Sequence, residues 1–280
     1  MKGYMSEDQL SASTPSATRI AAIQMVSTPV VEENIATVTR LVAEAAHQGA
    51  KLVLLPEYWA AMGLQETDKI ALAEQDGTGQ IQEFMSRIAR EYKVWLIGGT
   101  LPLAATADKV LNTMMVYDDA GKRVSRYDKI HLFSFTKGEE SYDEARTIVH
   151  GTQVGTFDAP FGKVGLSVCY DLRFPELYRA MGDCTLMVVP AAFTYTTGRA
   201  HWEILLRARA IENQCYILAA AQGGRHPNGR TTWGHSMLID PWGEIKSVWN
   251  EGEGLAIGDI DPHHLSRVRE NLPALKHRVL

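Results

Sequence analysis

Residues 164–179 read VGLSVCYDLRFPELYR, an apolar run of strand type that leads into a segment suited to a helix. One thiol, Cys169, lies where the two meet. A cysteine between a strand and a helix is held near free backbone N–H groups and the positive end of a helix dipole, which favour a thiolate over a thiol. The stretch therefore predicts a catalytic nucleophile, although a lone cysteine is also a common buried apolar residue.

The segments around this stretch alternate between strand and helix patterns. Residues 19–25 and 51–55 are short apolar runs, and residues 32–48 between them carry apolar side chains at helical spacing before Gly49. This order is a βαβ unit, which predicts an α/β fold of sheets covered by helices. The same patterns predict further helices over 81–92, 175–181, 200–213 and 263–271, and further strands over 94–99, 110–118, 122–127, 185–190, 216–221, 235–239, 245–249 and 255–260.

Two other apolar runs lead into a charged residue. LVLLPEYW at residues 52–59 contains Glu57, and RYDKIHLFSF at residues 126–135 contains Lys129 just after a strand-like segment. Groups at the ends of strands meet at one edge of a sheet in an α/β fold, so we expect this acid and this amine to approach the thiol of Cys169. The alternative for each charged residue is a solvated position on the surface.

The motifs LLPEYW, YDKIHLF and GLSVCYDLRFPE resemble the Glu, Lys and Cys motifs of the nitrilase superfamily of carbon–nitrogen hydrolases. The resemblance runs from about Arg19 to the C-terminus. It implies one domain over residues 19–280, a four-layer α-β-β-α sandwich with two sheets face to face and helices outside. It also implies a homodimer or higher homo-oligomer, joined through helices after the Cys motif and the C-terminal tail. Residues 1–18 are polar and are expected to form a disordered leader.

Hydrolysis of an amide requires a nucleophile, a group that takes and returns a proton, and positive charge beside the developing oxyanion. Cys169 suits the first role, Glu57 the second and Lys129 the third. The backbone N–H of Tyr170 follows the nucleophile and is a candidate second donor to the oxyanion.

The resemblance implies a second acid between the Lys and Cys motifs. Glu144 in SYDEART is the best match, and Glu139 and Glu140 lie close to it in the sequence. We expect this acid to orient Lys129 or the leaving amine.

The residues around and after the cysteine indicate a branch of the superfamily. CYDLRFPE is similar to the Nit branch of ω-amidases and deaminated glutathione amidases, and GRH at residues 224–226 followed by WGHSM is most like the latter. That resemblance implies cleavage of the amide between 2-oxoglutarate and cysteinylglycine through a cysteinyl thioester. Two alternatives stay open: an ω-amidase acting on 2-oxoglutaramate, and a non-catalytic partner protein on the same scaffold.

A substrate that carries carboxylates requires cationic groups in the protein. Arg173, four residues past the nucleophile, is the first candidate, and Arg225 and His226 are candidates at the pocket rim for the peptide end. Arg173 is equally suited to brace the turn through an ion pair with Asp171 or Glu176.

The histidines suggest two further sites, and neither is favoured. His201 invites comparison with the Cys–His pair of papain-like enzymes, but it lies in an amphipathic helix pattern where a packing role is more common. His263 and His264 are adjacent and lack other ligands at zinc spacing, so neither a metal nor a cofactor is expected.

The composition argues against several other classes. A formal charge of −5 without a cluster of Lys and Arg disfavours nucleic acid as a partner. No apolar run approaches the ~20 residues of a membrane span, so no membrane association is expected. The three cysteines lack C-x-x-C spacing and indicate a reducing compartment, for which we predict the cytoplasm.

Overall fold

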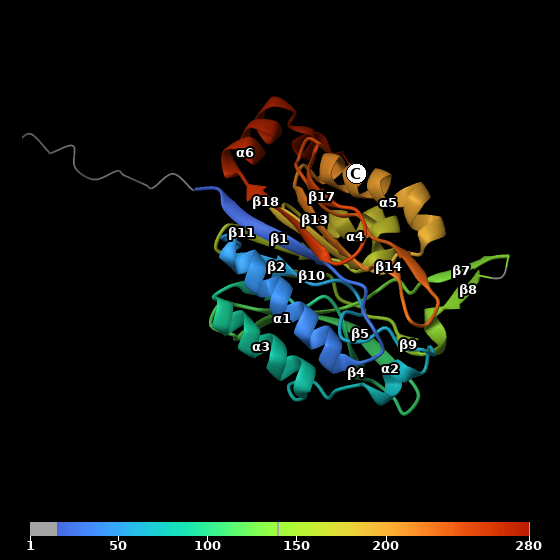
Figure 1. Ribbon diagram of the computed structural model, residues 1–280. Coiled ribbons are helices and arrows are strands. Elements are labelled where there is room, and N and C mark those ends of the chain that lie inside the picture. The colour runs from blue at the N-terminus through green and yellow to red at the C-terminus, as the bar shows by residue number, and fades with distance from the viewer. Residues whose placement is uncertain (1–15, 139, 280) are drawn as a thin grey trace, which may run out of the picture.

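The structure, a computed structural model, describes residues 16–138 and 140–279. Two β-sheets lie face to face and helices cover their outer faces, so the layers run helix, sheet, sheet, helix (Figure 1). This confirms the four-layer α-β-β-α sandwich in a single domain. Residues 1–15 of the predicted leader lie outside the described residues, and the first strand begins at Thr18.

The first sheet contains eight strands, six of them in the order β18-β1-β2-β3-β5-β4, with β6 and β9 paired to β5. Its central strands β1, β2 and β3 run parallel, as the βαβ pattern predicts. The strands are β1 (Thr18–Gln24), β2 (Leu52–Leu54), β3 (Trp95–Ile97), β4 (Leu101–Ala104), β5 (Val110–Tyr117), β6 (Arg123–Asp128), β9 (Ile148–Val149) and β18 (Gly254–Ile260).

The second sheet contains six strands in the order β10-β11-β12-β13-β16-β17, and β11, β12 and β13 run parallel. Met25 after β1 and Gln222 after β13 form a parallel bridge, so the parallel strands of both sheets end on the same side of the molecule. The strands are β10 (Gly155–Ala159), β11 (Gly162–Leu166), β12 (Leu186–Ala191), β13 (Tyr216–Ala221), β16 (Ser236–Ile239) and β17 (Ile245–Trp249).

Alternate residues of the central strands face different layers. Ile20 and Ala22 of β1 belong to a buried cluster shared with the second sheet, whereas Ala21 and Ile23 pack in a second cluster beneath the helices α1 and α3. A strand that is buried on both faces reads as a continuous apolar run, which is why these segments show no polar alternation. The helices are α1 (Val31–His47), α2 (Asp68–Ala71), α3 (Gln80–Tyr92), α4 (Pro175–Ala180), α5 (Tyr195–Asn213) and α6 (Pro262–Asn271).

Several short elements were not predicted from the sequence. The strands β7 and β8 pair only with each other and form a hairpin that projects from the body (Figure 1), so they carry little of the apolar alternation that marks a strand. Helix α5 begins at Tyr195, earlier than predicted, because the Thr194 hydroxyl caps its first turn by accepting from the N–H of Thr197. The remaining strands are β7 (Ser134–Lys137), β8 (Glu140–Asp143), β14 (Gly223–Arg225) and β15 (Thr231–Trp233).

Gly99, just after β3, packs closely against the neighbouring chain segment. It has a φ of 50°, and a Cβ there would overlap the carbonyl oxygen of Pro56 and lie 2.8 Å from that of Leu55. We expect Gly99→Ala to lower the free energy of unfolding by about 2–4 kcal/mol, since it adds both left-handed strain and overpacking. Denaturant titration measures this change. Gly77→Ala is the matched control, because Gly77 has a φ of 89° and open space around it; equal losses in the two variants would contradict the packing argument.

Candidate active site

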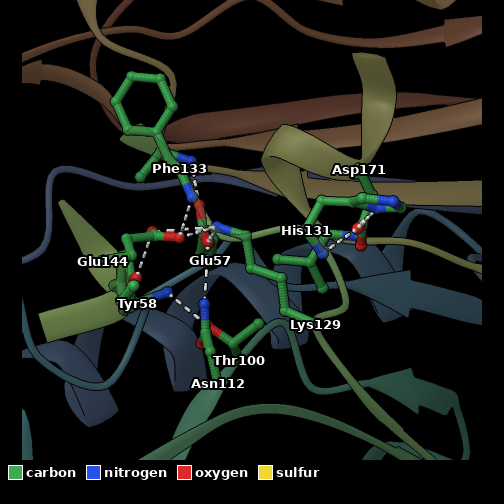
Figure 2. Close-up of polar contacts among 12 residues, drawn as sticks. Glu57, Tyr58, Thr100, Asn112, Lys129, His131, Phe133, Glu144 and Asp171 are labelled. Carbon is green, nitrogen blue, oxygen red and sulfur yellow. Dashed lines mark hydrogen bonds and ion pairs between the residues drawn. The ribbon is translucent and has the colours of Figure 1, made fainter. Parts of the chain in front are cut away.

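Glu57 lies just beyond β2, where the parallel strands end. Its Oε1 accepts hydrogen bonds from Asn112 Nδ2 at 3.0 Å and from Lys129 Nζ at 2.9 Å, as Figure 2 shows. Its Oε2 accepts the backbone N–H of Ala192 at 2.9 Å. Because Ala192 follows β12, both sheets hold the same carboxylate, and its orientation is fixed by three donors.

Lys129 follows β6 and lies between two acids (Figure 2). Its Nζ is 2.9 Å from Glu57 Oε1 and 2.8 Å from Glu144 Oε2. The side chains of Lys129, Glu57 and Glu144 are 0%, 1% and 11% exposed, so these charges interact with little screening by water. Burial by itself would lower the pKa of Lys129, but the two carboxylates raise this pKa well above its usual value, and the ammonium stays charged.

Glu144 lies in a single 3₁₀ turn, Glu144–Arg146, after the β7–β8 hairpin. Its oxygens accept from Lys129, from the Tyr58 hydroxyl at 2.8 Å and from the backbone N–H of Phe133 at 2.8 Å. Burial would raise the pKa of this carboxyl, yet Lys129 and the other donors lower it below its usual value.

Glu144 is thus the second acid in contact with Lys129, beside Glu57. Of the two neighbours in the sequence, Glu139 lies outside the described residues, and Glu140 is described for its backbone alone.

Cys169 begins a 3₁₀ turn, Cys169–Arg173, between β11 and α4. Its φ of 50° is unusual for a residue other than glycine, a strain that clusters at functional sites. Glu57, Lys129 and Glu144 all lie close enough to the thiol for their charges to act on it.

The predicted thiolate is wrong for the free protein. Burial raises the pKa of the Cys169 thiol well above its usual range, and the negative charge of Glu57 raises it further, while Lys129 opposes both effects only in part. The 3₁₀ turn separates the cysteine from the start of α4, so the helix dipole that the sequence suggested does not begin at the sulfur. Cys169 therefore rests as a thiol, and its proton has to move during attack.

Asp171 joins the cysteine turn to the loop that carries Lys129. Its Oδ2 accepts from the backbone N–H of Val168 at 2.9 Å and from the Tyr127 hydroxyl at 2.7 Å. Its Oδ1 accepts from the backbone N–H of His131 at 3.0 Å (Figure 2). This buried carboxylate fixes the nucleophile and the cation relative to each other.

Arg173 and Tyr170 line the pocket that contains Cys169, together with Phe193 and Phe133. The Arg173 guanidinium lies over the rings of Tyr170 and Phe193, at 5.7 and 5.4 Å from their centroids. Its Nη1 lies 3.2 Å from Nδ1 of His201. Among the ion pairs of the described residues none joins Arg173 to Asp171 or Glu176, so the bracing role considered above is not realised.

The two residues predicted at the pocket rim, Arg225 and His226, do not line the Cys169 pocket. His226 is buried, and its two ring nitrogens lie 2.9 Å from the Ser27 carbonyl oxygen and 2.8 Å from the Thr232 hydroxyl. It therefore has no free nitrogen for a substrate, and burial lowers its pKa. Arg225 ends β14 with an exposed side chain and is not among the residues that line the Cys169 pocket. His201 contacts Arg173 rather than forming a Cys–His pair.

Sequence reasoning missed Tyr58 and Asn112. Both donate to the acids of the site, Tyr58 to Glu144 and Asn112 to Glu57. A weak signal existed for each: Tyr58 directly follows the acid in its motif, and Asn112 is a polar residue within a largely apolar strand. The Ala192 N–H carries no side-chain signal and is visible only in the fold.

A thiol, a carboxylate and a fixed ammonium that lie close together are groups that a hydrolase with a cysteine nucleophile uses, so this fold and site are those expected of a hydrolase. The carbon-nitrogen hydrolase family model matches residues 19–270, and the chain belongs to this family. It is accordingly a hydrolase that acts on carbon–nitrogen bonds.

Relatives and solved structures agree with this assignment. The deaminated glutathione amidase of Synechocystis is 42% identical over 266 residues, 92% of this chain and 97% of that protein. Human omega-amidase NIT2 is 36% identical over 268 residues, 93% of this chain and 94% of that one. The crystal structure of the C. elegans NitFhit protein superposes with a TM-score of 0.86 at 36% identity, covering 94% of this chain and 65% of that chain, slightly under two thirds of its length. The resemblance to the Nit branch is confirmed.

Two further observations concern metal binding and membrane spanning. Within the described ranges, no group of three or more His, Cys, Asp or Glu side chains is placed to hold a metal ion. No helix of the described residues combines the length and the apolar character needed to cross a membrane.

Proposed function

We propose that this protein is a thiol-dependent amidase that cleaves a small amide bearing carboxylates through a thioester on Cys169. The observation that carries the proposal is the placement of Lys129 Nζ, 2.9 Å from Glu57 and 2.8 Å from Glu144, close enough to the Cys169 thiol for these charges to act on it. The three groups supply a nucleophile, a proton acceptor and a fixed positive charge.

The first half of the reaction forms the thioester. The Sγ of Cys169 attacks the amide carbon while Glu57 takes the thiol proton. The carbonyl oxygen becomes an oxyanion, which the ammonium of Lys129 and the N–H of Tyr170 stabilise. The C–N bond then breaks, and Glu57 returns the proton to the departing amine. Glu144 keeps Lys129 charged and in position.

The second half releases the acid. Water attacks the thioester carbon as Glu57 takes one of its protons, and the same two donors stabilise the second oxyanion. The C–S bond breaks, and the sulfur recovers its proton from Glu57. The enzyme returns to the thiol form that burial favours.

The substrate we propose is deaminated glutathione, cleaved to 2-oxoglutarate and cysteinylglycine. The 42% identity to a deaminated glutathione amidase supports it, and Arg173 in the Cys169 pocket supplies a cation for the carboxylate of the acyl part. The second candidate is 2-oxoglutaramate, supported by the 36% identity to an omega-amidase.

Release of 2-oxoglutarate from both amides tests the proposal. We expect kcat/KM for deaminated glutathione to exceed that for 2-oxoglutaramate by about 10-fold or more, since a larger substrate offers more contacts in the transition state. A preference for a simple nitrile or a ureido acid would contradict both assignments. Absence of turnover on every amide would favour the alternative of a non-catalytic partner protein, a role for which neither a buried lysine between two acids nor a nearby thiol is needed.

We further propose that copies of this chain associate through the outer face of α5. Ile204 and Ile211 lie seven residues apart on this helix and are exposed, as is the nearby large side chain Trp242. Light scattering on the purified protein measures the molar mass, which should be at least that of a dimer and should fall in Ile204→Glu. A single-chain mass for the unaltered protein would contradict this association.

The protein's compartment is a separate proposal. The three free, buried cysteines support a place in the cytoplasm.

A further inference from the structure

Two cations from separate segments, neither of which lines the Cys169 pocket, contact one exposed acid. Lys69 belongs to α2, and Arg230 lies between β14 and β15. Lys69 Nζ is 2.8 Å from Glu66 Oε2, and Arg230 Nη1 is 3.4 Å from Glu66 Oε1. The three side chains carry a net charge of +1, so the cations exceed the acid that they share.

The cations face inward and their acid faces water. The side chains of Lys69 and Arg230 are 15% and 24% exposed, whereas that of Glu66 is 55% exposed. Each cation also lies over an aromatic ring, Lys69 at 5.5 Å from the centroid of Tyr58 and Arg230 at 4.9 Å from that of Tyr142. These rings hold the two positive charges in place when the weak and exposed contact to Glu66 breaks.

Arg230 lines two pockets, one shared with Lys69 and one that reaches Glu144. Tyr58, Glu66, Lys69 and Arg230 line one pocket, and Arg230 also lines a second with Tyr58 and Glu144. Phe133 lines this second pocket and the Cys169 pocket as well, so the three spaces are neighbours. Arg173 and the Lys69–Arg230 pair therefore line different pockets, and Phe133 connects the pocket of Arg173 to one of those lined by Arg230.

We propose that Lys69 and Arg230 bind a carboxylate on the leaving amine of the substrate, which takes the place of Glu66. This inference rests on the proposed amidase function and deepens it. With the acyl part anchored near Arg173, the other substituent of the amide extends past Glu144 toward this pair. The preferred substrates are then amides whose amine product is itself an acid, such as a dipeptide, rather than primary amides that release ammonia.

The test measures kcat/KM of the unaltered protein and of Arg230→Gln on two amides. For deaminated glutathione, whose amine product ends in a carboxylate, we expect the variant to lose about 10- to 100-fold, mostly through a higher KM, because a charged hydrogen bond is lost. For 2-oxoglutaramate the loss should be at least about 10-fold smaller, since its amine product carries no carboxylate. Arg87→Gln is the matched control, because Arg87 also lies over a ring, that of Phe84, but on the outer helix α3.

A change in the substrate checks the same contact without any variant. Deaminated glutathione with its glycine carboxylate converted to an amide should be a poorer substrate for the unaltered protein, and Arg230→Gln should reduce its turnover little further. Glu66→Gln should lower KM for the free acid, since it removes the competing carboxylate.

The outcomes separate this inference from the function on which it rests. Hydrolysis of both amides with equal losses in Arg230→Gln, or equal turnover of the acid and its amide form, would overturn the carboxylate site alone. Unaltered protein that hydrolyses neither amide would overturn the carboxylate site together with the amidase proposal.

Discussion

Replacing Cys169 with alanine is expected to lower kcat by about 10⁴-fold or more, because the variant lacks the thiol that we propose forms the covalent bond to the substrate. The free energy of unfolding should change by only about 1 kcal/mol, since the substitution removes a single sulfur atom from a buried position. Steady-state assays and thermal unfolding of the same preparation measure both quantities.

Cys184 and Cys215 provide the matched controls for this prediction. Both are buried in the core, and burial raises the pKa of Cys184 to about 11. Neither lines the pocket of Cys169, so alanine at either position should leave kcat within about 3-fold while costing about 1 kcal/mol of stability. A folded Cys169→Ala protein that kept normal rates would show that the nucleophile is a different group.

Replacing Lys129 with methionine should abolish turnover and lower the free energy of unfolding by about 3–5 kcal/mol at pH 7, the usual result of leaving buried charge without its partner. Methionine fills a similar volume but leaves Glu57 and Glu144 buried together with no cation between them. Denaturant titration measures the loss. Lys122→Met serves as the control, because its side chain is exposed and a surface substitution changes stability by about 0.5 kcal/mol or less.

Between pH 5 and pH 8 the stability of this variant should depend on pH, whereas the contributions of Glu144 and Lys129 to the stability of the unaltered protein should stay constant. The folded-state pKa of Glu144 is lowered, so its stabilisation is present above the unfolded pKa of about 4.3 and is lost as pH falls through the folded value. The pKa of Lys129 is raised, so its contribution is complete below its unfolded pKa of about 10.4. In Lys129→Met one proton shared by the two acids would relieve their repulsion, so stability should rise from pH 8 to pH 5. A stability that is parallel to that of the unaltered protein over this range would contradict the coupling of the three charges.

The central part of this site could be predicted from the sequence because each group lies within three residues of the end of a strand. Glu57, Lys129 and Cys169 lie at strand ends, and the parallel strands of both sheets end on one side of the molecule. Strand ends that are adjacent in space bring side chains together even when forty or more positions separate them in the chain.

The remainder depends on tertiary contacts that leave no local pattern. The resting state of Cys169 follows from burial beside Glu57, whereas the sequence suggested only a helix dipole. His226 looked available as a polar residue after two glycines, but the fold buries it between Ser27 and Thr232. Arg230 lies in a loop and belongs to no motif, so the sequence did not indicate a role for it. Its contact with Tyr142 depends on the β7–β8 hairpin, an element without apolar alternation.

The most direct test is the mass of the Cys169 peptide after rapid acid quench of the enzyme at saturating deaminated glutathione. We predict a fraction of this peptide that is heavier by one 2-oxoglutaryl group, with unchanged Cys184 and Cys215 peptides. A stoichiometric burst of cysteinylglycine with an unmodified Cys169 peptide, or the acyl group on any other residue, would contradict the thioester.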